Sequence, residues 1–357
     1  MNLENIRIKR WFEEKMRIKP ALDIAKVNES LSKRLPQFDG PWTSKKTAHG
    51  QSNPTFILTG KTDKKLVLRR KPDGKLLKSA HMVEREYQIM KALADTQVPV
   101  PQVFYLCSDI NEIGSIFFIM EFIDGITFSE PQLAELSVAE RRKVYESMNS
   151  GLASLHRLDP TEIGLAEFGS KGNYFERQLS IWSRQFELST TETIIEMELL
   201  KDWLLKNVPN DIVKPRIVHG DWRIDNLLFS KNDFSLLAII DWELSTLGDP
   251  RADLAGQLMQ WSMPVGLESR GLAGFNRVQF GIPSDEQYIS DYCQRLGLSE
   301  PLDLTFAVAF SYYRMAAILQ GVKKRALAGN ASNPEKGIRM GKFVSICAKL
   351  ALDYLQI

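Results

Sequence analysis

The amino-acid sequence predicts an α+β chain of two lobes, a small antiparallel β lobe and a larger, mainly α-helical lobe. Its 357 residues are enough for two lobes that each have a hydrophobic core. Short apolar runs with strand character end near residue 123. Beyond that point, long segments carry apolar residues at the three- and four-residue spacing of amphipathic helices. The predicted lobes are therefore residues 1–123 and 124–357.

The N-terminal lobe begins with a predicted helical extension over residues 1–35. Apolar residues recur there at helical spacing from Ile24 to Leu35, and the proline and glycine residues that follow break the helix. The remaining segments form an antiparallel sheet that carries one main helix. The predicted strands are 55–59, 66–69, 103–106 and 115–122, and the predicted helix is 81–93.

The C-terminal lobe is predicted to be mainly helical, with one short β segment at 216–241. That segment contains a polar turn at 230–233 and is predicted to form a β-hairpin. Ser284 and Gln287 have the spacing of a capping box at a helix N-terminus. The predicted helices are 137–155, one or two within 174–206, one from Ser284 to about Gly297, 303–328 and 333–355.

Composition excludes several classes of protein. The net charge of +2 is too balanced to predict nucleic-acid binding. The three cysteines lie far apart without CxxC spacing, so neither a disulfide framework nor a structural zinc site is expected. The charged N-terminus does not resemble a secretory signal, and no apolar run of about 18 residues predicts a membrane span. We therefore expect a cytoplasmic protein that does not bind membranes.

Segment 219–241 carries the residue types that phosphoryl transfer requires. Mg²⁺ must bridge and neutralise phosphate oxygens, and it prefers hard oxygen ligands such as those of Asn226 and Asp241. A further group must orient the acceptor hydroxyl and take its proton, and Asp221 can do so from the same loop as Asn226. The alternative is a polar hairpin on the surface, since Asp and Asn are common in turns. That alternative does not explain the spacing and order of these residues.

The same segment resembles a known superfamily. The motif His-Gly-Asp-x-x-x-x-Asn at 219–226, followed by an apolar strand that ends in Asp241, resembles the catalytic and metal-binding loops of protein-kinase-like enzymes. With Ile-Asp-Trp-Glu at 240–243, it is closest in form to the aminoglycoside phosphotransferase and choline kinase-like family. Segment 248–255 is similar to the element after the metal loop in that family.

The N-terminal lobe extends the resemblance, which covers residues 42–325 in all. Segments 68–72 and 79–87 resemble the branch related to the kinase-like domain that is fused to some acyl-CoA dehydrogenases. The resemblance implies a protein-kinase-like two-lobed fold with a cleft between the lobes. It also implies an ATP- and Mg²⁺-dependent enzyme that transfers the γ-phosphate of ATP to a hydroxyl group of a small molecule.

The resemblance also implies a role for each residue of the motif. Asp221 would be the catalytic base, and Asn226 and Asp241 would bind Mg²⁺. His219 and Asp253 would be structural and would support the catalytic loop. Because all three chemical residues are present, the sequence argues against a catalytically inactive relative.

On the nucleotide side, kinase-like folds pair a basic residue on the third strand with a glutamate on the helix. Here Arg69 stands where lysine is usual, and Glu86 is its expected partner, with Glu84 as the alternative. Arginine can hold phosphate and carboxylate through two hydrogen bonds. If the register of the strand shifts, Arg70 or Lys71 would be the phosphate-binding residue. Alternatively, these basic residues only form a solvated strand edge and bind no ligand.

Two further segments would bind the nucleotide. The loop that covers the phosphates is expected at 50–53, where an ordinary turn is the alternative. The backbone that bonds adenine is expected at 121–123, where a buried strand is the alternative. The residues predicted to contact the cofactor in these segments are Gly50, Gln51, Ser52, Asn53, Glu121 and Ile123.

The acceptor side is predicted from aromatic and arginine residues near the catalytic loop and in the helices after it. Arg314 lies within an apolar helix, so it either pairs with a buried acid or binds an anion. Because residues 262–284 show no acidic cluster, we expect a neutral or anionic hydroxylated metabolite, such as a hydroxyacyl compound, rather than an aminoglycoside. The candidate residues are Trp222, Arg223, Tyr174, Arg177, Trp182, Tyr313 and Arg314.

Three other functions are alternatives to this one. A protein Ser/Thr kinase is disfavoured because Gly220 replaces the arginine after His219 and no Ala-Pro-Glu segment follows Asp241. A metal hydrolase is disfavoured because the four histidines show no ligand spacing. A nucleotide- or metabolite-binding module without turnover stays open. The sequence does not identify the acceptor, does not distinguish ATP from GTP as the phosphate donor, and does not determine the oligomeric state.

Overall fold

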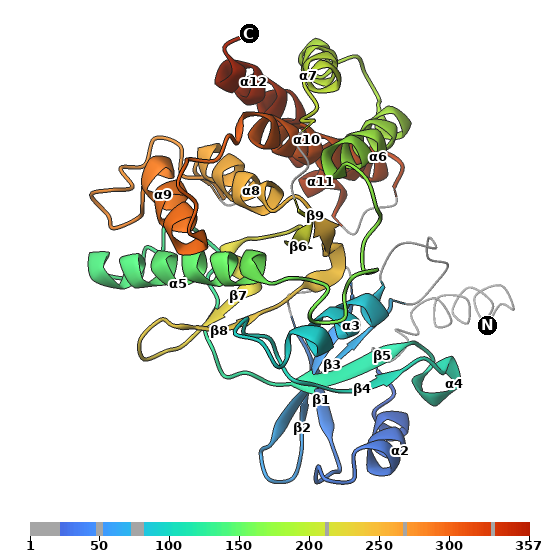
Figure 1. Cartoon of the computed structure of the whole chain (residues 1–357). Coiled ribbons are helices and arrows are strands. Elements are labelled where there is room, and N and C mark those ends of the chain that lie inside the picture. Colours follow the sequence, from blue (N-terminus) through green and yellow to red (C-terminus); the bar gives the residue numbers. More distant parts are fainter. Residues whose placement is uncertain (1–21, 48–52, 73–81, 211–213, 267–269, 330–332) are drawn as a thin grey trace, which may run out of the picture. The chain divides into compact units, whose positions relative to one another are not determined.

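The computed structural model describes residues 22–47, 53–72, 82–210, 214–266, 270–329 and 333–357 (Figure 1). The chain divides into two compact units. The first consists of Met1–Lys91 with Pro101–Phe122, and the second of Ala92–Val100 with Ile123–Ile357. The architecture is the α+β class that the sequence predicts, with a sheet in the first unit and mainly helices in the second.

The first unit contains a five-stranded antiparallel sheet. All four predicted strands are present, and one strand was not predicted. The additional strand, β1, has four exposed residues and therefore shows no alternation of apolar and polar positions. In sheet order the strands are β1 Thr43–Lys46, β2 Thr55–Thr59, β3 Lys65–Arg70, β5 Phe117–Glu121 and β4 Val103–Cys107.

Three helices accompany this sheet: α2 Ile24–Arg34, α3 Val83–Leu93 and α4 Ile110–Ile113. α2 begins at Asp23, whose side chain accepts a hydrogen bond from the Lys26 N–H. Val27 and Leu31 of α2 are buried in one core with residues of β2 and β5. The predicted helical extension is thus present from residue 24 to 34, while residues 1–21 lie outside the described part of the chain.

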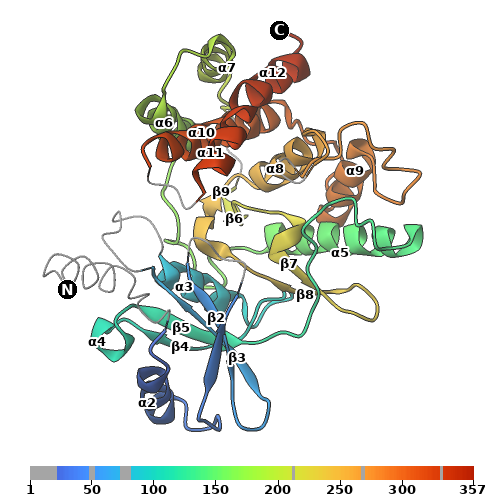
Figure 2. The ribbon, with the colours of Figure 1, turned by 180° about the vertical axis from the view of Figure 1, so that it is seen from behind.

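The second unit is built around α10 Thr305–Leu327, which has its most extensive contacts with four other helices and also contacts α7 Ile195–Lys206 (Figures 1 and 2). Those four helices are α6 Tyr174–Ser189, α8 Arg251–Ser262, α11 Pro334–Gly341 and α12 Phe343–Leu355. The remaining helices are α5 Val138–Arg157 and α9 Asp285–Leu296. No helix in the described part of the chain is long and apolar enough to cross a membrane.

Two predictions for this unit need correction. The single helix predicted at 333–355 is two helices, α11 and α12, separated at Lys342. α11 packs closely against α10, where a Cβ on Gly337 would be 2.7 Å from the Cβ of Ala326. The β segment at 216–241 is also not a single hairpin, because its first strand, Arg216–Val218, pairs with a strand that follows residue 241.

Four short strands frame the catalytic segment. β6 Arg216–Val218 pairs with β9 Thr246–Gly248, and β7 Leu227–Phe229 forms the predicted hairpin with β8 Leu236–Ile239. The connections β6–β7 and β8–β9 each contain one 3₁₀ turn. This topology places the predicted base in the first connection and the predicted metal ligand Asp241 at the start of the second.

Candidate active site

The catalytic segment is anchored by Asp253, which lies in the first turn of α8. Its carboxylate accepts hydrogen bonds from the backbone N–H of His219 at 2.6 Å and from that of Gly220 at 2.8 Å. The side chain is 2% exposed and also contacts the His156 ring, with Nε2 at 3.2 Å from Oδ2. These are the contacts that the predicted supporting role of Asp253 requires, and the role itself stays a prediction.

A buried chain of polar groups continues behind Asp253. The Tyr292 hydroxyl lies 2.6 Å from Nδ1 of His156. Burial by itself would raise the pKa of Asp253. The hydrogen bonds from His156 and from the Gly220 N–H outweigh that effect, so the pKa lies below its usual value. The carboxylate is thus held ionised in the core. His156 directly follows the predicted helix 137–155, and nothing else in the sequence predicts its contact with Asp253.

The predicted base and metal ligand lie in direct contact within this loop. Nδ2 of Asn226 donates to the backbone carbonyl of Asp221 at 2.8 Å and to its Oδ2 at 2.9 Å. The other carboxylate oxygen of Asp221 is 3.4 Å from Nε of Arg223. The Asp221 side chain is nevertheless 34% exposed. Its orientation is fixed while part of the carboxylate stays accessible to an acceptor.

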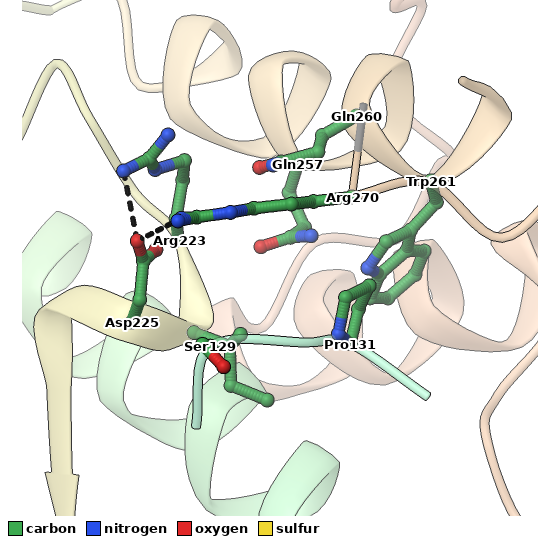
Figure 3. Close-up of a pocket in the computed structure, with 9 residues that line it drawn as sticks. Ser129, Pro131, Arg223, Asp225, Gln257, Gln260, Trp261 and Arg270 are labelled. Atoms are coloured by element: carbon green, nitrogen blue, oxygen red, sulfur yellow. Dashed lines mark hydrogen bonds and ion pairs between the residues drawn. The ribbon is translucent and has the colours of Figure 1, made fainter. Parts of the chain in front are cut away.

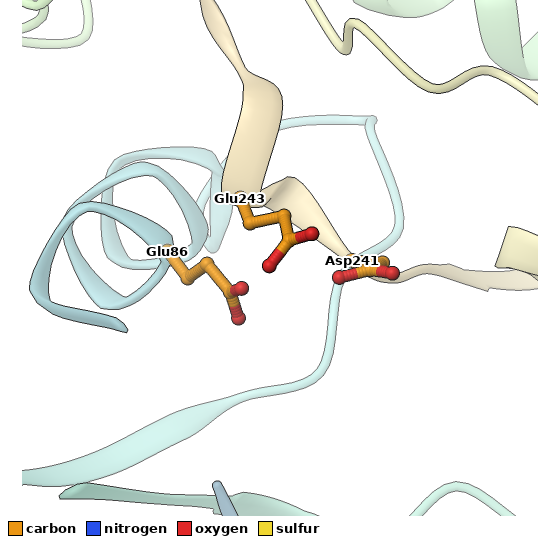
Figure 4. Close-up of side chains that lie close together, drawn as sticks. All are labelled: Glu86, Asp241 and Glu243. Carbon is orange, nitrogen blue, oxygen red and sulfur yellow. The ribbon is translucent and has the colours of Figure 1, made fainter. Parts of the chain in front are cut away.

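His219 connects this loop to the predicted metal ligand Asp241. Its Nε2 lies 3.0 Å from the Ile240 carbonyl, and its Nδ1 accepts from the backbone N–H of Asp221 at 3.2 Å. These partners assign a neutral ring that is protonated on Nε2. Asp241 follows with a left-handed backbone (φ 67°), and its side chain and that of Glu243 come from the connection between β8 and β9 (Figure 4). Left-handed backbone in a residue other than glycine is typical of functional sites.

Gly220 is required by the conformation of the catalytic loop. Its φ is +82°, and a Cβ there would lie 2.6 Å from the Leu244 carbonyl oxygen. We expect Gly220→Ala to lower the free energy of unfolding by about 1–3 kcal/mol and to displace the loop. Gly256→Ala is the matched control, because Gly256 is helical and has open space around its Cβ position. Urea unfolding should show the control unchanged or more stable by about 0.5–1 kcal/mol, and equal losses in both variants would contradict this account.

In the first unit, Arg69 and Glu86 form the pair that the sequence predicts. Nε of Arg69 lies 2.6 Å from Oε2 of Glu86, and Nη2 donates to Oε1 at 2.8 Å. Both side chains are buried, and Asn53 also donates to Oε1 at 3.3 Å. Glu86 comes from α3 (Figure 4), while Lys71 pairs instead with Glu84 at 2.7 Å. The register of β3 therefore selects Arg69 rather than Lys71 as the partner of Glu86.

The remaining predicted nucleotide contacts are only partly described. Gly50, Gln51 and Ser52 lie outside the described residues. Glu121 ends β5, where its backbone N–H donates to the Gln102 carbonyl at 2.8 Å and its carboxylate accepts from the Gln102 N–H at 3.2 Å. The carbonyl of Ile123 accepts from the Gly125 N–H at 3.0 Å. Their contact with a nucleotide stays a prediction.

Three of the residues predicted to contact the acceptor are buried aromatic residues. Trp222 is 3% exposed with its ring against His219, and Tyr313 is fully buried with its hydroxyl donating to Ser183. The ring of Tyr174 fills the space beside Gly248. Burial raises the pKa of the Tyr174 hydroxyl to about 12. These aromatic side chains pack in the core beside the motif, and their contact with an acceptor stays a prediction.

Arg314 supports the catalytic loop. Its Nη2 donates to the Gly220 carbonyl at 2.7 Å, and its guanidinium lies 5.4 Å from the centre of the Trp182 ring. In the part of the chain that the structure covers, Arg314 forms no ion pair, so the predicted buried acid partner is not observed. Arg177 donates to the Lys171 carbonyl at 3.0 Å beside the start of α6.

A small pocket beside Asp225 was not predicted from the sequence. Nη2 of Arg223 lies 2.9 Å from Oδ2 of Asp225, and Nη1 of Arg270 lies 2.5 Å from the same atom (Figure 3). Gln257 and Trp261 of α8 also line the pocket. Burial lowers the pKa of Arg223, but the charges of Asp221, Asp225 and Asp241 outweigh it and raise the pKa. Among the residues that line this pocket, only Arg223 is a predicted acceptor contact, because it lies within the motif at 219–226.

Comparison with known proteins identifies relatives over almost the whole chain. The sequence profile of the phosphotransferase enzyme family (APH) matches residues 43–288. Acyl-CoA dehydrogenase family member 10 of Mus musculus is 42% identical over 316 residues, which are 88% of this chain and 29% of the relative. Family member 11 of Homo sapiens is 37% identical over 336 residues, 93% of this chain and 42% of the relative. The chain thus spans less than half the length of these relatives.

Solved structures agree with this assignment. A Ralstonia eutropha JMP134 protein, provisionally described as an aminoglycoside phosphotransferase, has a TM-score of 0.85 and 39% identity, with 94% of this chain and 98% of that chain covered. A thermostable mutant of aminoglycoside phosphotransferase APH(4)-Ia, in a ternary complex with ADP and hygromycin B, has a TM-score of 0.62 and 13% identity, with 92% and 98% covered. The second likeness shows the fold alone, which is the predicted kinase-like α+β fold. The chain therefore belongs to the phosphotransferase enzyme family and is an enzyme that transfers phosphate to a hydroxyl group.

Proposed function

We propose that this enzyme transfers the γ-phosphate of ATP, in the presence of Mg²⁺, to a hydroxyl group of a neutral or anionic small metabolite. The observation that carries the proposal is the catalytic loop itself. Asp221 is oriented by Asn226, partly exposed, and held on a loop whose amides are bound by Asp253. Positioning and charge stabilisation supply most of the catalysis in phosphoryl transfer, and this loop provides the positioning.

The oxygen atoms of the loop suit Mg²⁺. Asn226 uses its Nδ2 to orient Asp221, so its Oδ1 is the atom left to bind a cation. With the Asp241 carboxylate this makes two hard oxygen donors, the number that Mg²⁺ commonly takes from a protein. When bound, the ion would neutralise charge on the phosphate oxygens. Asn226 and Asp241 are thus the proposed ligands.

Asp221 is the proposed base of the transfer. Its carboxylate takes the proton of the acceptor hydroxyl as the acceptor oxygen forms a bond to the γ-phosphorus. The bond between that phosphorus and the β–γ bridging oxygen breaks, and ADP leaves with the electron pair. Arg223, whose Nε lies 3.4 Å from Oδ1 of Asp221, forms an ion pair with this carboxylate.

On the nucleotide side, Arg69 is proposed to bind phosphate while Glu86 holds its guanidinium in place. We expect Arg69→Met to weaken ATP binding about tenfold, because a charge-assisted hydrogen bond contributes about 1.5–3 kcal/mol. Arg69→Lys should recover most of the affinity, since lysine keeps the charge. Isothermal titration with ATP and Mg²⁺ checks this, with Arg142→Met on the exposed face of α5 as the control. Equal affinities in Arg69→Met and the wild type would assign Arg69 a structural role.

The acceptor is proposed to be neutral or anionic, with a hydroxyacyl compound as one option. Asp225, the acid beside the base, is already paired with two arginines and is poorly suited to attract a polycation. A panel of hydroxylated acceptors with ATP or GTP and Mg²⁺, followed by the mass increase of phosphorylation, tests the proposal. Hydroxyacyl compounds and other uncharged or acidic metabolites should react faster than aminoglycosides. An aminoglycoside that outpaces them would overturn the acceptor class, and no transfer to any acceptor would overturn the kinase.

A further inference from the structure

We propose that the pocket beside Asp225 is the subsite for the non-reacting end of the acceptor, and that Arg270 makes it select a carbonyl-type oxygen over an ammonium group. This proposal rests on the transfer proposed above and specifies the chemistry of its substrate. The Asp225 pocket is lined by residues of three separate parts of the chain: near Ser129, at 223–225, and on or after α8, namely Gln257, Gln260, Trp261 and Arg270. All of them belong to the second unit, so the pocket exists within that unit.

The position of the pocket ties it to the chemistry. Arg223 lines the pocket and pairs with Asp225 through Nη2, while its Nε faces the base Asp221 at 3.4 Å. One guanidinium group therefore separates the pocket from the proposed catalytic base. An acceptor whose hydroxyl lies at Asp221 can reach the pocket with its other end if the two ends are a few bonds apart.

The charge of the lining excludes cations. Two arginines and one aspartate line the pocket, which leaves one net positive charge. Both arginines point at the same carboxylate oxygen of Asp225 (Figure 3), so an ammonium group would find that oxygen already in use. An oxygen that carries negative or partial negative charge would be attracted instead.

Arg270 is held in this position by its backbone as well as by Asp225. Its φ is 51°, which is uncommon for a residue other than glycine, and its N–H donates to the Gly266 carbonyl at 2.7 Å. The Gly271 carbonyl that follows accepts from Gln132 at 3.2 Å. The Arg270 side chain is 34% exposed, and only Nη1 is used on Asp225. Its other N–H groups are placed to bind a ligand.

Two buried polar atoms on α8 give an independent indication of a ligand. Gln257 is 3% exposed and Trp261 is 1% exposed, and they lie one turn apart on the face of α8 that lines the pocket. Among the described residues, neither Oε1 of Gln257 nor Nε1 of Trp261 has a hydrogen-bond partner. Buried polar groups are normally paired, so these two atoms require an explanation. A ligand oxygen could accept from Trp261, and a carboxamide could also donate to Gln257.

Three probes that differ only at one end test the charge selection: 5-hydroxypentanoate, 5-hydroxypentanamide and 5-aminopentan-1-ol. Their dissociation constants are measured by ligand-observed NMR titration of the full chain without nucleotide. We expect the carboxylate and the carboxamide to bind at least about tenfold more tightly than the ammonium compound. Arg270→Glu should reverse the order of the two charged probes, and Arg270→Gln should bring them together.

The control is Arg142→Gln, which removes one positive charge from the exposed face of α5, outside the pocket. It should leave the order of the probes as in the wild type. A charge preference that changes equally in Arg142→Gln and Arg270→Gln would overturn the proposal, as would failure of all three probes to bind the wild type.

Gln257→Leu separates a ligand contact from a structural role. Leucine removes the amide while it keeps much of the volume, so the melting temperature should stay the same or rise when a buried unpaired oxygen disappears. The affinity for 5-hydroxypentanamide should nevertheless fall about tenfold. Unchanged affinity for this probe would overturn the subsite.

Failure of this proposal and failure of the proposed function give different results. Probes that bind in the expected order to a chain that transfers no phosphate leave the pocket assignment standing and remove the kinase. Phosphate transfer with probes that bind without charge preference leaves the kinase standing and removes the pocket assignment.

Discussion

Replacing Asp221 by asparagine is expected to lower the rate of phosphoryl transfer by about a thousandfold or more. General base catalysis contributes roughly 10²–10⁴ to such rates, and an amide cannot take the proton of the acceptor hydroxyl. The shape of the side chain is kept, and the amide oxygen can still accept from Nδ2 of Asn226. The loop should therefore stay in place, and the loss should appear in kcat rather than in the affinity for nucleotide.

The experiment uses the best acceptor from the panel and follows ADP formation at saturating ATP. Asp233→Asn is the matched control, because Asp233 lies exposed in the turn between β7 and β8 and bonds only within that turn. The control should react at the wild-type rate. If Asp221→Asn keeps more than a tenth of the wild-type kcat, Asp221 is not the base. If the wild type transfers phosphate to no acceptor, a binding module without turnover becomes the better description.

Much of this loop could be predicted because its contacts are local in sequence. Asp221 and Asn226 are five residues apart in one turn, and the structure joins them by two hydrogen bonds. Arg69 and Glu86 lie on neighbouring elements, and the register of one strand decides their pairing. Spacing and residue type predict the first contact, whereas for the second the sequence leaves Glu84, Arg70 and Lys71 open and the strand register is needed to decide.

The Asp225 pocket could not be predicted for the opposite reason. Its lining comes from three segments, and neither Gln257 nor Arg270 belongs to a motif. Gln257 lies on α8 and Arg270 lies after it, and only the tertiary fold brings both to Asp225. The same limit explains Trp222 and Tyr313, which were predicted to contact the acceptor and are buried. A sequence shows that an aromatic residue lies near a motif, but not which side of the loop it faces.

The residue on which the loop depends most is Asp253. We expect Asp253→Asn to lower the free energy of unfolding by about 3–5 kcal/mol, because removing one member of a buried charged network leaves its partners unsatisfied. In the wild type the carboxylate accepts from two backbone N–H groups and contacts His156. An asparagine NH₂ would face one of these donors. Urea unfolding measures the loss, with Asp202→Asn on the exposed side of α7 as a control that should change stability by less than about 0.5 kcal/mol.

The pH dependence of this loss identifies its electrostatic part. The pKa of Asp253 is lower in the folded protein than in the unfolded chain, where it is about 3.9. The ionised group therefore stabilises the fold fully at pH values above the unfolded pKa. That stabilisation is lost as the pH falls through the folded pKa. Asp253→Asn lacks the titration. The difference in stability between wild type and variant should therefore be constant from about pH 7 to pH 5 and shrink below about pH 4. A difference that stays the same down to pH 3 would mean that Asp253 acts through packing and not through its charge, and the loop would then have to be held by the other contacts of His219 and Gly220.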